Sequence, residues 1–306
     1  MTLQQIRYLC AVVRARLNMS RAAQALGASQ PAVSQQIKAL EETLGSPIFI
    51  RSQNRLLGLT PRGEAIVAAA QNVLADVVEL ERAAERRANA GFSQIRVVST
   101  HPQARYTLPR AIREFQSRCP GVAVHVTHRY DEKLWQLVQN GQADIAVTTD
   151  PQGAPSTLLN VPCYPMKRSL VAPKGHPLLH KRALRLEDIG QHPLVGYDER
   201  SNGHRRLLRA FNAAGLAPRI AVTGADEDVI KACVEEGLGV AILASIVFDA
   251  KRDVSLGSVD VTALLEPSVT SVVLRRKESR VTHIQQFVEC FAPQWTREAL
   301  RQLAEE

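Results

Sequence analysis

Four polar side chains on one face of a predicted helix have the chemistry needed to contact the edges of nucleic-acid bases. They are Gln30, Ser34, Gln35 and Lys38. Glutamine amides can pair with adenine, and a lysine can bind guanine or phosphate in the major groove of DNA. A helical hairpin with an ordinary solvated face would show similar residue types. These side chains therefore predict a DNA-contacting face only if the surrounding elements present them in a suitable unit.

A second set of polar residues could bind a small anion. Residues 100–103 and 198–204 each lie between a predicted strand and the start of a predicted helix. Open α/β sheets bind ligands beside the carboxyl ends of their strands, where N–H groups at helix N-termini favour negative charge. The candidate donors are Ser99, Thr100, Gln103, Thr148 and Thr149 on one side, with Arg200, Ser201, Asn202 and His204 closing from a second lobe.

These residues also have simpler interpretations. Each hydroxyl group could serve as a helix cap or a turn residue. His101 and His204 are interpreted as hydrogen-bonded loop residues rather than catalytic groups. Pro102 also removes one backbone donor from the first cluster.

The base-contacting face belongs to a predicted helix-turn-helix over residues 20–44. Ser20 is the expected N-cap of its short first helix, and Gly27 supplies the turn because glycine tolerates positive φ angles. Ser29 is the expected cap of the second helix, and Pro31 is tolerated in its first turn. The predicted apolar positions are Ala23, Ala25 and Leu26 in the first helix and Val33, Ile37, Leu40 and Leu44 in the second.

Neighbouring segments complete a winged unit. Residues 2–17 predict an amphipathic helix with Thr2 as its N-cap, and residues 48–50 and 56–59 predict two short strands. The apolar positions of that helix are Leu3, Ile6, Leu9, Cys10 and Val13. The turn RSQNR between the strands is polar and basic, which places two arginines near phosphate. The residues expected to contact DNA are Ser29, Gln30, Pro31, Ser34, Gln35, Lys38, Arg51 and Arg55.

A single long helix is predicted next, from Thr60 and Pro61 to about Ala88. Its apolar seam consists of Ile66, Ala70, Val73, Val77, Leu80 and Ala84. The alternating spacing of four and three is typical of helix-to-helix packing, and a helix between two domains has no core of its own to cover this seam. We therefore expect a dimer contact.

From Ser93 onward, short apolar runs alternate with helical periodicity. The predicted strands are 94–99, 122–126, 144–149, 169–172, 193–197, 219–222, 240–243 and 271–275, and the predicted helices begin near 107 or cover 134–138, 203–214, 226–236 and 281–291. This alternation predicts an α/β architecture with mostly parallel sheets.

Charge and cysteine content narrow the range of partners. Residues 1–62 contain eight Lys and Arg but only two acidic residues, whereas the rest of the chain contains 30 basic and 28 acidic residues. This asymmetry indicates a polyanion partner for the N-terminal segment. The five cysteines form no CxxC pair or metal-ligand cluster, so we expect reduced, mostly buried thiols and no metal. Since we find no secretory signal and no apolar run of ~20 residues, we expect a cytoplasmic protein with no membrane partner.

The residues AAQALGASQPAVSQQIKALEETLGSPIFIR and LTPRG, followed by one long helix and an α/β region, resemble the LysR-type transcriptional regulators. The resemblance covers essentially the whole chain. It implies an α/β fold with an all-α N-terminal part: a winged helix-turn-helix at 1–60, a dimerising linker helix at 61–90 and a periplasmic-binding-protein-like effector domain at 91–306. Lobe I would comprise about 91–163 and 266–306, and lobe II about 164–265. The implied partners are double-stranded promoter DNA, a small-molecule effector, RNA polymerase and further copies of the chain in a homodimer or homotetramer.

Other stretches resemble one group within this family, the cysteine-biosynthesis regulators of the CysB type. They include STHPQARYTLP (99–109), PCYPMKRSLVAPKGHPL (162–178) and GLGVAILAS (237–245). That group governs sulfate and sulfonate assimilation genes and responds to sulfate-like anions or acylated serine. The resemblance therefore implies sulfate, thiosulfate or an acylated serine as the effector. The anion site of the group is rich in small polar residues, and Thr100, Gln103 and Thr149 match it.

Three positions depart from that pattern. Pro102 and Asn202 stand where the group typically has threonine, and Met166 replaces an aromatic residue. Fewer hydroxyl donors predict weaker sulfate binding. Arg200, whose planar fork can bind two oxygens, would instead favour a carboxylate or a larger sulfur-containing acid. The expected effector-site residues are Ser99, Thr100, His101, Gln103, Thr148, Thr149, Met166, Arg200, Ser201, Asn202 and His204.

Other classes of protein fit less well. A periplasmic solute-binding protein would need a secretory signal and no basic helix-turn-helix. An enzyme would need a nucleophile with a base or a metal set, and GxSxG, P-loop and HExxH patterns are absent. An architectural DNA-binding protein would not need the α/β region. We therefore expect a non-enzymatic regulator of sulfur assimilation or, alternatively, of another pathway with a carboxylate effector.

Overall fold

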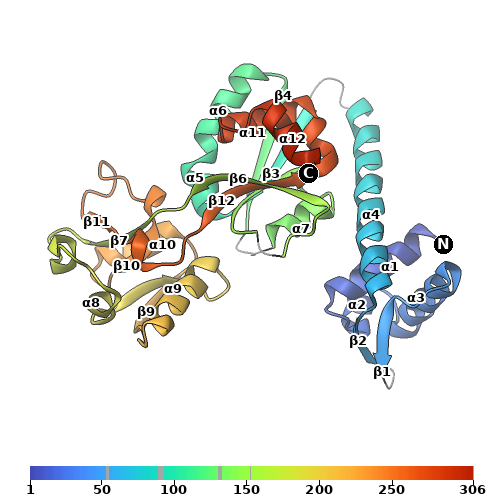
Figure 1. Cartoon of the computed structure of the whole chain (residues 1–306), viewed down its shortest axis with the longest axis horizontal. Helices are drawn as coiled ribbons and strands as arrows, with labels where there is room; N and C mark the ends of the chain where they lie inside the picture. The colour runs from blue at the N-terminus through green and yellow to red at the C-terminus, as the bar shows by residue number, and fades with distance from the viewer. Residues whose placement is uncertain (53–54, 89–92, 130–132, 152, 306) are drawn as a thin grey trace. The chain divides into compact units, whose positions relative to one another are not determined.

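A computed structural model of the chain describes residues 1–52, 55–88, 93–129, 133–151 and 153–305 (Figure 1). The chain divides into two compact units, Met1–Gly91 with Gln139–Gln142 and Phe92–Val138 with Ala143–Glu306. Within the described ranges, no helix is both long enough and apolar enough to span a membrane.

The N-terminal unit has the predicted winged helix-turn-helix architecture followed by one long helix (Figure 1). Its elements are α1 (Leu3–Arg14), α2 (Met19–Ala25), α3 (Gln30–Leu44), β1 (Phe49–Ser52), β2 (Arg55–Leu59) and α4 (Pro61–Ala88). The strands β1 and β2 pair antiparallel to form the wing.

Helix caps fix where these helices begin. Thr2 forms a capping box with Gln5 at the start of α1, and the Ser29 hydroxyl accepts the Ala32 N–H at 3.3 Å. The Thr60 hydroxyl accepts the N–H of Gly63 at 2.8 Å and starts α4. The turn residue Gly27 has a φ of 61°. These predicted caps and the predicted turn are confirmed.

The prediction that Ser20 caps the second helix is wrong. The Asn18 side chain accepts the Arg21 N–H at 2.9 Å, so α2 begins at Met19. Asparagine caps as well as serine does, and it lies earlier in the chain. The first helix also ends earlier than predicted, because Arg16 and Leu17 adopt positive φ angles of 54° and 63°.

Several predicted core positions at the helix ends are exposed. Leu9, Cys10, Val33, Ile37 and Leu40 are buried as predicted. Three other predicted core residues, Leu3, Ala25 and Leu44, are exposed. Two more, Val13 and Leu26, are half-buried. Val12 and Ala22, which were not predicted, are buried. The core is small and lies where α1, α2 and α3 cross, so residues beyond the crossing reach solvent. Helical periodicity cannot show where a neighbouring helix ends.

The apolar seam of α4 is divided between two environments. Ile66 and Ala70, at the start of the helix, pack into the winged-helix core. The expectation that no domain core would cover the seam is therefore wrong for these two residues. Val73 and Leu80 are 41% and 72% exposed. The side chain of Ala84 lies outside those that the structure describes.

The second unit has two lobes. Lobe I is a five-stranded sheet in the order β4-β3-β5-β12-β6. Its strands are β3 (Ser93–Ser99), β4 (Val122–His128), β5 (Ile145–Thr149), β6 (Leu158–Pro165) and β12 (Val269–Arg275), and its helices are α5 (His101–Tyr106), α6 (Leu108–Arg118), α7 (Leu134–Gln139), α11 (Thr282–Phe291) and α12 (Arg297–Glu305).

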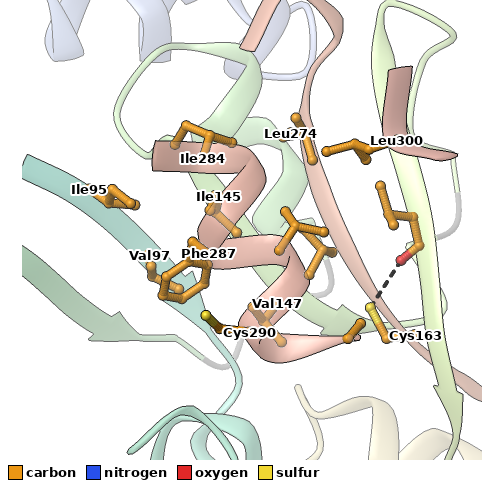
Figure 2. Close-up of a cluster of buried hydrophobic side chains, with 14 of the residues drawn as sticks. Ile95, Val97, Ile145, Val147, Cys163, Leu274, Ile284, Phe287, Cys290 and Leu300 are labelled. Atoms are coloured by element: carbon orange, nitrogen blue, oxygen red, sulfur yellow. Dashed lines mark hydrogen bonds between the residues drawn. The ribbon is translucent and has the colours of Figure 1, made fainter. Parts of the chain in front are cut away.

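Alternating side chains let helices cover both faces of this sheet. Ile145 and Val147 lie in a core with Phe287 of α11, shown in Figure 2, whereas Ala146 between them lies in a second core with residues of α7. This period of two is the signature of a strand buried on both faces. The thiol of Cys163 donates to the Val161 carbonyl within the first core.

Lobe II contains two small sheets, β10-β7-β11 and β8-β9. Its strands are β7 (Arg168–Pro173), β8 (Leu194–Tyr197), β9 (Ile220–Gly224), β10 (Ala241–Ala244) and β11 (Leu256–Asp260), and its α-helices are α8 (Leu186–Gly190), α9 (Asn202–Ala213) and α10 (Glu227–Glu235). A parallel bridge from Leu194 to Val240 connects the two sheets.

The α/β class is confirmed, but the expectation of mostly parallel sheets is wrong. Strand β3 runs parallel to β4 and β5, and β8 runs parallel to β9. Strand β12 runs antiparallel to β5 and β6, and β7 runs antiparallel to β10 and β11. The chain passes between the lobes twice, from β6 to β7 and from β11 to β12, and both β7 and β12 run antiparallel to their neighbours in the sheet. The elements that periodicity missed are α5, α8, α12, β6 and β11.

None of the five cysteines is bonded to another. Three of them, Cys10, Cys163 and Cys290, are buried. Burial raises the pKa of Cys10 to about 11 and that of Cys163 to about 12, so both thiols stay protonated at neutral pH.

The close approach of Gly63 to the wing predicts a strong effect of Gly63→Ala. A Cβ at this position would lie 2.1 Å from the backbone oxygen of Ile48, so backbone atoms must move. We expect the variant to lose about 2 kcal/mol or more of local stability. Hydrogen exchange of α1 and α3 in the full-length protein measures this loss.

Gly58→Ala is the matched control in the same unit. Its Cβ would lie 3.8 Å from the Ile50 side chain, which is an ordinary contact. We expect exchange rates close to those of the wild type. Equal rates in the two variants would show that the Gly63 contact does not constrain the wing.

Candidate nucleic-acid interface and ligand cleft

The structure places the predicted base-contacting residues on the solvent face of α3. Gln30, Gln35 and Lys38 are exposed, and Ser34 is half-buried. Val33 and Ile37 hold the opposite face in the core, so the polar face has a fixed orientation. The Lys38 amino group lies 3.9 Å from Glu42 and its side chain is 78% exposed, which leaves it accessible to another anion.

The wing is fastened to α3 by one carboxylate. Glu41 accepts the N–H groups of Ile48 and Phe49 at 2.8 and 3.1 Å and forms an ion pair with Arg51 at 2.8 Å. Arg51 therefore braces the wing, in addition to the phosphate role predicted for it. Arg55 is exposed at the start of β2. Residues 53 and 54 of the predicted turn lie outside the described residues.

A cleft with about 700 Å³ of open space lies between the lobes of the second unit. On lobe I its walls follow the carboxyl ends of β3, β4 and β5, and on lobe II those of β8, β9 and β10. This is where open α/β sheets bind ligands. The lining residues are Thr100, His101, Pro102, Gln103, Arg129, Thr149, Met166, Arg168, Tyr197, Ser201, Asn202, Gly203, Arg206, Ala225, Glu227 and Ala244.

The structure brings together seven of the eleven predicted effector-site residues at this cleft. They are Thr100, His101, Gln103, Thr149, Met166, Ser201 and Asn202. Ser99 is buried and donates to the Val147 carbonyl at 3.1 Å, and His204 bonds the Tyr197 carbonyl at 2.9 Å. The Thr148 hydroxyl is buried without a hydrogen-bond partner in the described part of the chain. These three residues lie behind the cleft wall.

Arg200 does not line the cleft. Its side chain is 78% exposed and pairs with Asp198 at 2.8 Å. The cations that do line the cleft are Arg129, Arg168 and Arg206, which sequence reasoning missed. Arg168 lies just before the predicted strand 169–172 and Arg206 lies inside the predicted helix 203–214, so neither stood in the two segments chosen as the site.

Arg206 connects lobe II to the crossing between the lobes. It forms an ion pair with Asp150 and donates to the carbonyl groups of Glu266 and Pro267 at 3.2 and 3.4 Å. The other carboxylate oxygen of Asp150 accepts the Val269 N–H at 2.9 Å. Asp150 has a φ of 48°, a left-handed conformation that aspartate adopts more readily than most residues with a side chain.

Arg168 is one of the three arginines that line the cleft. Among the described residues, none accepts a hydrogen bond from its guanidinium group or forms an ion pair with it. Burial lowers its pKa, because a charged group loses hydration there. A partly desolvated cation without a carboxylate favours a bound anion.

A contact between His101 and Glu227 joins the two lobes across the cleft. Glu227 is 1% exposed, and its carboxylate bonds the His101 ring at Nδ1. This bond raises the pKa of His101 above its ordinary value of 6.5, although burial opposes the shift. Nearby, Tyr106 donates to Asp228 at 2.9 Å and Arg105 pairs with it at 3.0 Å. Helix α5 of lobe I is thus tied to the start of α10 in lobe II.

His101, Asp226 and Asp228 offer ligand atoms within 4.8 Å of one another. Both carboxylates are already engaged, because Asp226 caps α10 and Asp228 bonds Tyr106 and Arg105. The group therefore works as a contact between the lobes.

Tyr197 forms part of the apolar wall in lobe II. A Cβ on Gly203 would lie 2.6 Å from its ring, so glycine at this position lets the ring pack against the start of α9. Burial, and then the Glu227 carboxylate, raise the pKa of Tyr197 well above its usual range. Its hydroxyl group therefore stays neutral.

Gln103 is held rigidly beneath the cleft. Its amide oxygen accepts from the hydroxyl groups of Tyr164 and Thr107, and its amide nitrogen donates to Thr270 at 3.2 Å. The predicted contribution of helix N-termini to anion binding stays a prediction for α9, which has 12 residues. Helix α5 has six residues, too few for a substantial dipole.

The winged helix-turn-helix and the two-lobed domain with a cleft between its lobes define the class of this protein: a DNA-binding transcriptional regulator that responds to a small ligand. Residues 3–64 match the bacterial regulatory helix-turn-helix proteins of the lysR family, and residues 90–296 match the LysR substrate binding domain. The chain belongs to the LysR family of transcriptional regulators.

Its relatives confirm the predicted resemblance to the CysB group. The chain is 36% identical to the transcriptional regulator SsuR of Burkholderia cenocepacia, covering 96% of this chain and 95% of SsuR. It is also 36% identical to CysB of the same organism, over 99% and 96% of the two chains. The chain also superposes on the crystal structure of the cofactor-binding domain of the Cbl transcriptional regulator with a TM-score of 0.64. The two sequences are 29% identical, and the match covers 70% of this chain and 95% of the Cbl domain.

The His101–Glu227 contact predicts a pH-dependent stability of the second unit. The folded-state pKa of His101 is raised, so its stabilising contribution is complete below pH 6.5 and is lost as pH rises through the folded-state value. The charged and titratable groups that face His101 are Asp226, Glu227, Asp228 and His128. Thermal unfolding of the wild type and of His101→Gln, measured across this range, should differ most at the acidic end.

His125→Gln is the control, because His125 is an exposed residue of β4. We expect its melting temperature to follow the wild-type pH profile. A constant difference between wild type and His101→Gln at every pH would contradict a charged contact with Glu227.

Proposed function

We propose that this LysR-type regulator binds promoter DNA and controls sulfur assimilation genes in response to a small anion held in the cleft between its lobes. The observation that carries this proposal is the Arg168 guanidinium group, which lines the cleft without a carboxylate partner among the described residues. A metabolite anion would supply the missing charge. The resemblance to the cysteine-biosynthesis regulators supports sulfur assimilation as the regulated pathway.

In this proposal α3 enters the major groove. Gln30, Ser34, Gln35 and Lys38 contact base edges, and Arg55 contacts phosphate on the flank. Ser29 and Pro31 define the start of the helix that faces the DNA backbone. Arg51 contributes partly through its ion pair with Glu41, which keeps the wing in place.

The effector in this proposal bridges the two lobes. Thr100 and Thr149 offer hydroxyl donors from lobe I, and Asn202 offers an amide from lobe II. Arg168 takes the cationic role predicted for Arg200. A sulfur-containing anion fits the resemblance, and a carboxylate effector of another pathway is the alternative that ligand binding would reveal.

Ligand binding changes DNA binding only if the ligand prefers one arrangement of the lobes. The contacts of His101 with Glu227 and of Arg206 with Asp150 both cross between the lobes, so their formation depends on how far the cleft closes. We propose that the effector shifts this equilibrium. Coupling to the DNA-binding units then passes through α4.

We further propose that the protein acts as a homodimer that assembles into a homotetramer, and that it contacts RNA polymerase at promoters in the cytoplasm. The exposed Val73 and Leu80 support the dimer, because a helix with two large exposed apolar residues on one seam favours a partner helix. Two DNA-binding units on one partly palindromic site also bind more selectively than one.

Base contact by α3 is tested with Gln35→Ala. On a DNA site selected by the wild type from a random-sequence pool, we expect a loss of ~1–3 kcal/mol and relaxed preference at one base position. Arg55→Ala should weaken all sequences alike and reduce the salt dependence by about one counterion. Binding titrations at several salt concentrations separate the two effects. Unchanged affinity and preference in Gln35→Ala would show that another face contacts the bases.

The α4 seam is tested with the double substitution Val73→Asp and Leu80→Asp. Two charges in an apolar helix contact are costly to bury, so sedimentation should show dissociation to smaller species. Val254→Asp is the control, because Val254 is an exposed apolar residue of the other unit at 66% exposure. Wild-type assembly in the double variant would show that the dimer forms elsewhere.

A further inference from the structure

We infer that Arg168 anchors the acidic head group of the effector, and that the effector is an organic sulfonate whose carbon chain packs on the apolar wall of lobe II. This inference rests on the proposed function and narrows the class of ligand that the cleft takes.

The charges of the cleft leave a net positive excess. Three arginines line it, Arg129, Arg168 and Arg206, against one lining carboxylate, Glu227, and Asp150 pairs with Arg206. Arg168 has no carboxylate partner within the part of the chain that the structure describes. A partly buried guanidinium group is stabilised by an anion that replaces its lost hydration.

The backbone of Arg168 is fixed before any ligand binds. Its N–H donates to the Thr262 hydroxyl at 2.9 Å, and its carbonyl accepts the Val261 N–H at 2.9 Å. Strand β7 lies between β10 and β11, so both sides of the strand are paired. The guanidinium group therefore extends from a rigid base, which lowers the ordering cost of binding.

The neutral donors around the cleft come from separate elements and both lobes. Thr100 follows β3, Thr149 ends β5 and Asn202 begins α9. In the described structure, neither threonine hydroxyl forms a hydrogen bond. A sulfonate has three oxygens arranged as a tripod and can accept from all these directions. A planar carboxylate has two oxygens, which a single guanidinium fork can saturate.

An apolar wall begins directly beside Arg168. Ala244 on β10 is its strand partner, and its small side chain leaves room for a ligand chain. Met166, two residues before Arg168, is 5% exposed. Tyr197 and Ala225 extend the wall, and Pro102 faces the cleft from lobe I. Inorganic sulfate would gain nothing from this surface, whereas each buried methylene should tighten binding roughly fourfold.

Calorimetry on the full-length protein with methane-, ethane-, propane- and butanesulfonate tests the inference. We expect the dissociation constant to fall roughly fourfold per added methylene. Sulfate and the carboxylates of equal chain length should bind at least tenfold more weakly than butanesulfonate. A flat series, or sulfate binding as tightly as butanesulfonate, would overturn the apolar contact. Carboxylates that match the sulfonates would overturn the choice of head group.

Three variants assign the two parts of the ligand to the two parts of the cleft. Arg168→Gln should weaken every sulfonate at least tenfold and keep the chain-length dependence. Met166→Ser should reduce that dependence and leave methanesulfonate affinity close to wild type. Arg200→Gln is the matched control, since Arg200 lies outside the cleft, and should change neither quantity. Wild-type affinity in Arg168→Gln would refute the anchor.

If Arg168→Gln lowers the melting temperature, Arg168→Lys is the variant to measure, because it keeps the positive charge. It loses the planar fork, so sulfonate affinity should fall between those of wild type and Arg168→Gln. Wild-type affinity in Arg168→Lys would show that the fork makes no specific contact.

The response of DNA binding separates this inference from the proposed function. Butanesulfonate should shift the affinity of the wild type, but not of Arg168→Gln, for a DNA site selected from a random-sequence pool. If it binds the protein and leaves DNA affinity unchanged, the regulatory function fails and the ligand class stands. If sulfate alone binds and shifts DNA affinity, the ligand class fails and the regulatory function stands.

Discussion

The chain passes twice between the lobes of its second unit, and the organisation of the cleft depends on this double crossing. Strands β6 and β12 lie side by side at the crossing, and the Met166 N–H bonds the Ser268 carbonyl at 2.8 Å just beyond them (Figure 1). Both lobes therefore keep their own hydrophobic cores, while their parallel strands direct their carboxyl ends to the same cleft. Arg206 and Asp150 form an ion pair, and both also bond backbone groups of the returning segment, at Glu266 and Val269. A change in lobe closure would therefore alter this ion pair.

The electrostatics of the cleft follow from partners that come from different lobes. A buried carboxylate such as Glu227 is costly without a partner, and the His101 ring supplies a hydrogen-bond partner from the opposite lobe. Closure of the cleft and protonation of His101 are therefore linked, because the raised pKa of His101 requires the contact with Glu227. Arg168 has no such partner among the described residues, so its charge is available to a ligand. The same cleft thus contains contacts that hold the lobes together and a cation that an anion can bind.

The DNA-binding unit is built on a different principle, in which one carboxylate organises a small domain. Glu41 bonds two N–H groups at the start of the wing and pairs with Arg51, so three polar contacts join α3 to the wing. A long helix then continues from the Thr60 cap without a break in the described residues. Ile66 and Ala70 of its apolar seam pack into the winged-helix core, whereas Val73 and Leu80 are exposed. One helix thus contributes to the core of the unit and also presents exposed apolar side chains.

The sequence by itself determined the helix-turn-helix, the linker helix, the α/β class and seven of the residues at the cleft, because caps, turns and periodicity are local properties. Ser29, Gly27 and Thr60 act through neighbours within a few positions, so their roles could be inferred directly. Strand direction, the ends of the buried faces and the charge partners depend on residues far apart in the chain. Arg168 lay just outside a predicted strand, and Arg200 lay in a loop at the predicted site. Only the tertiary structure placed the first in the cleft and paired the second with Asp198.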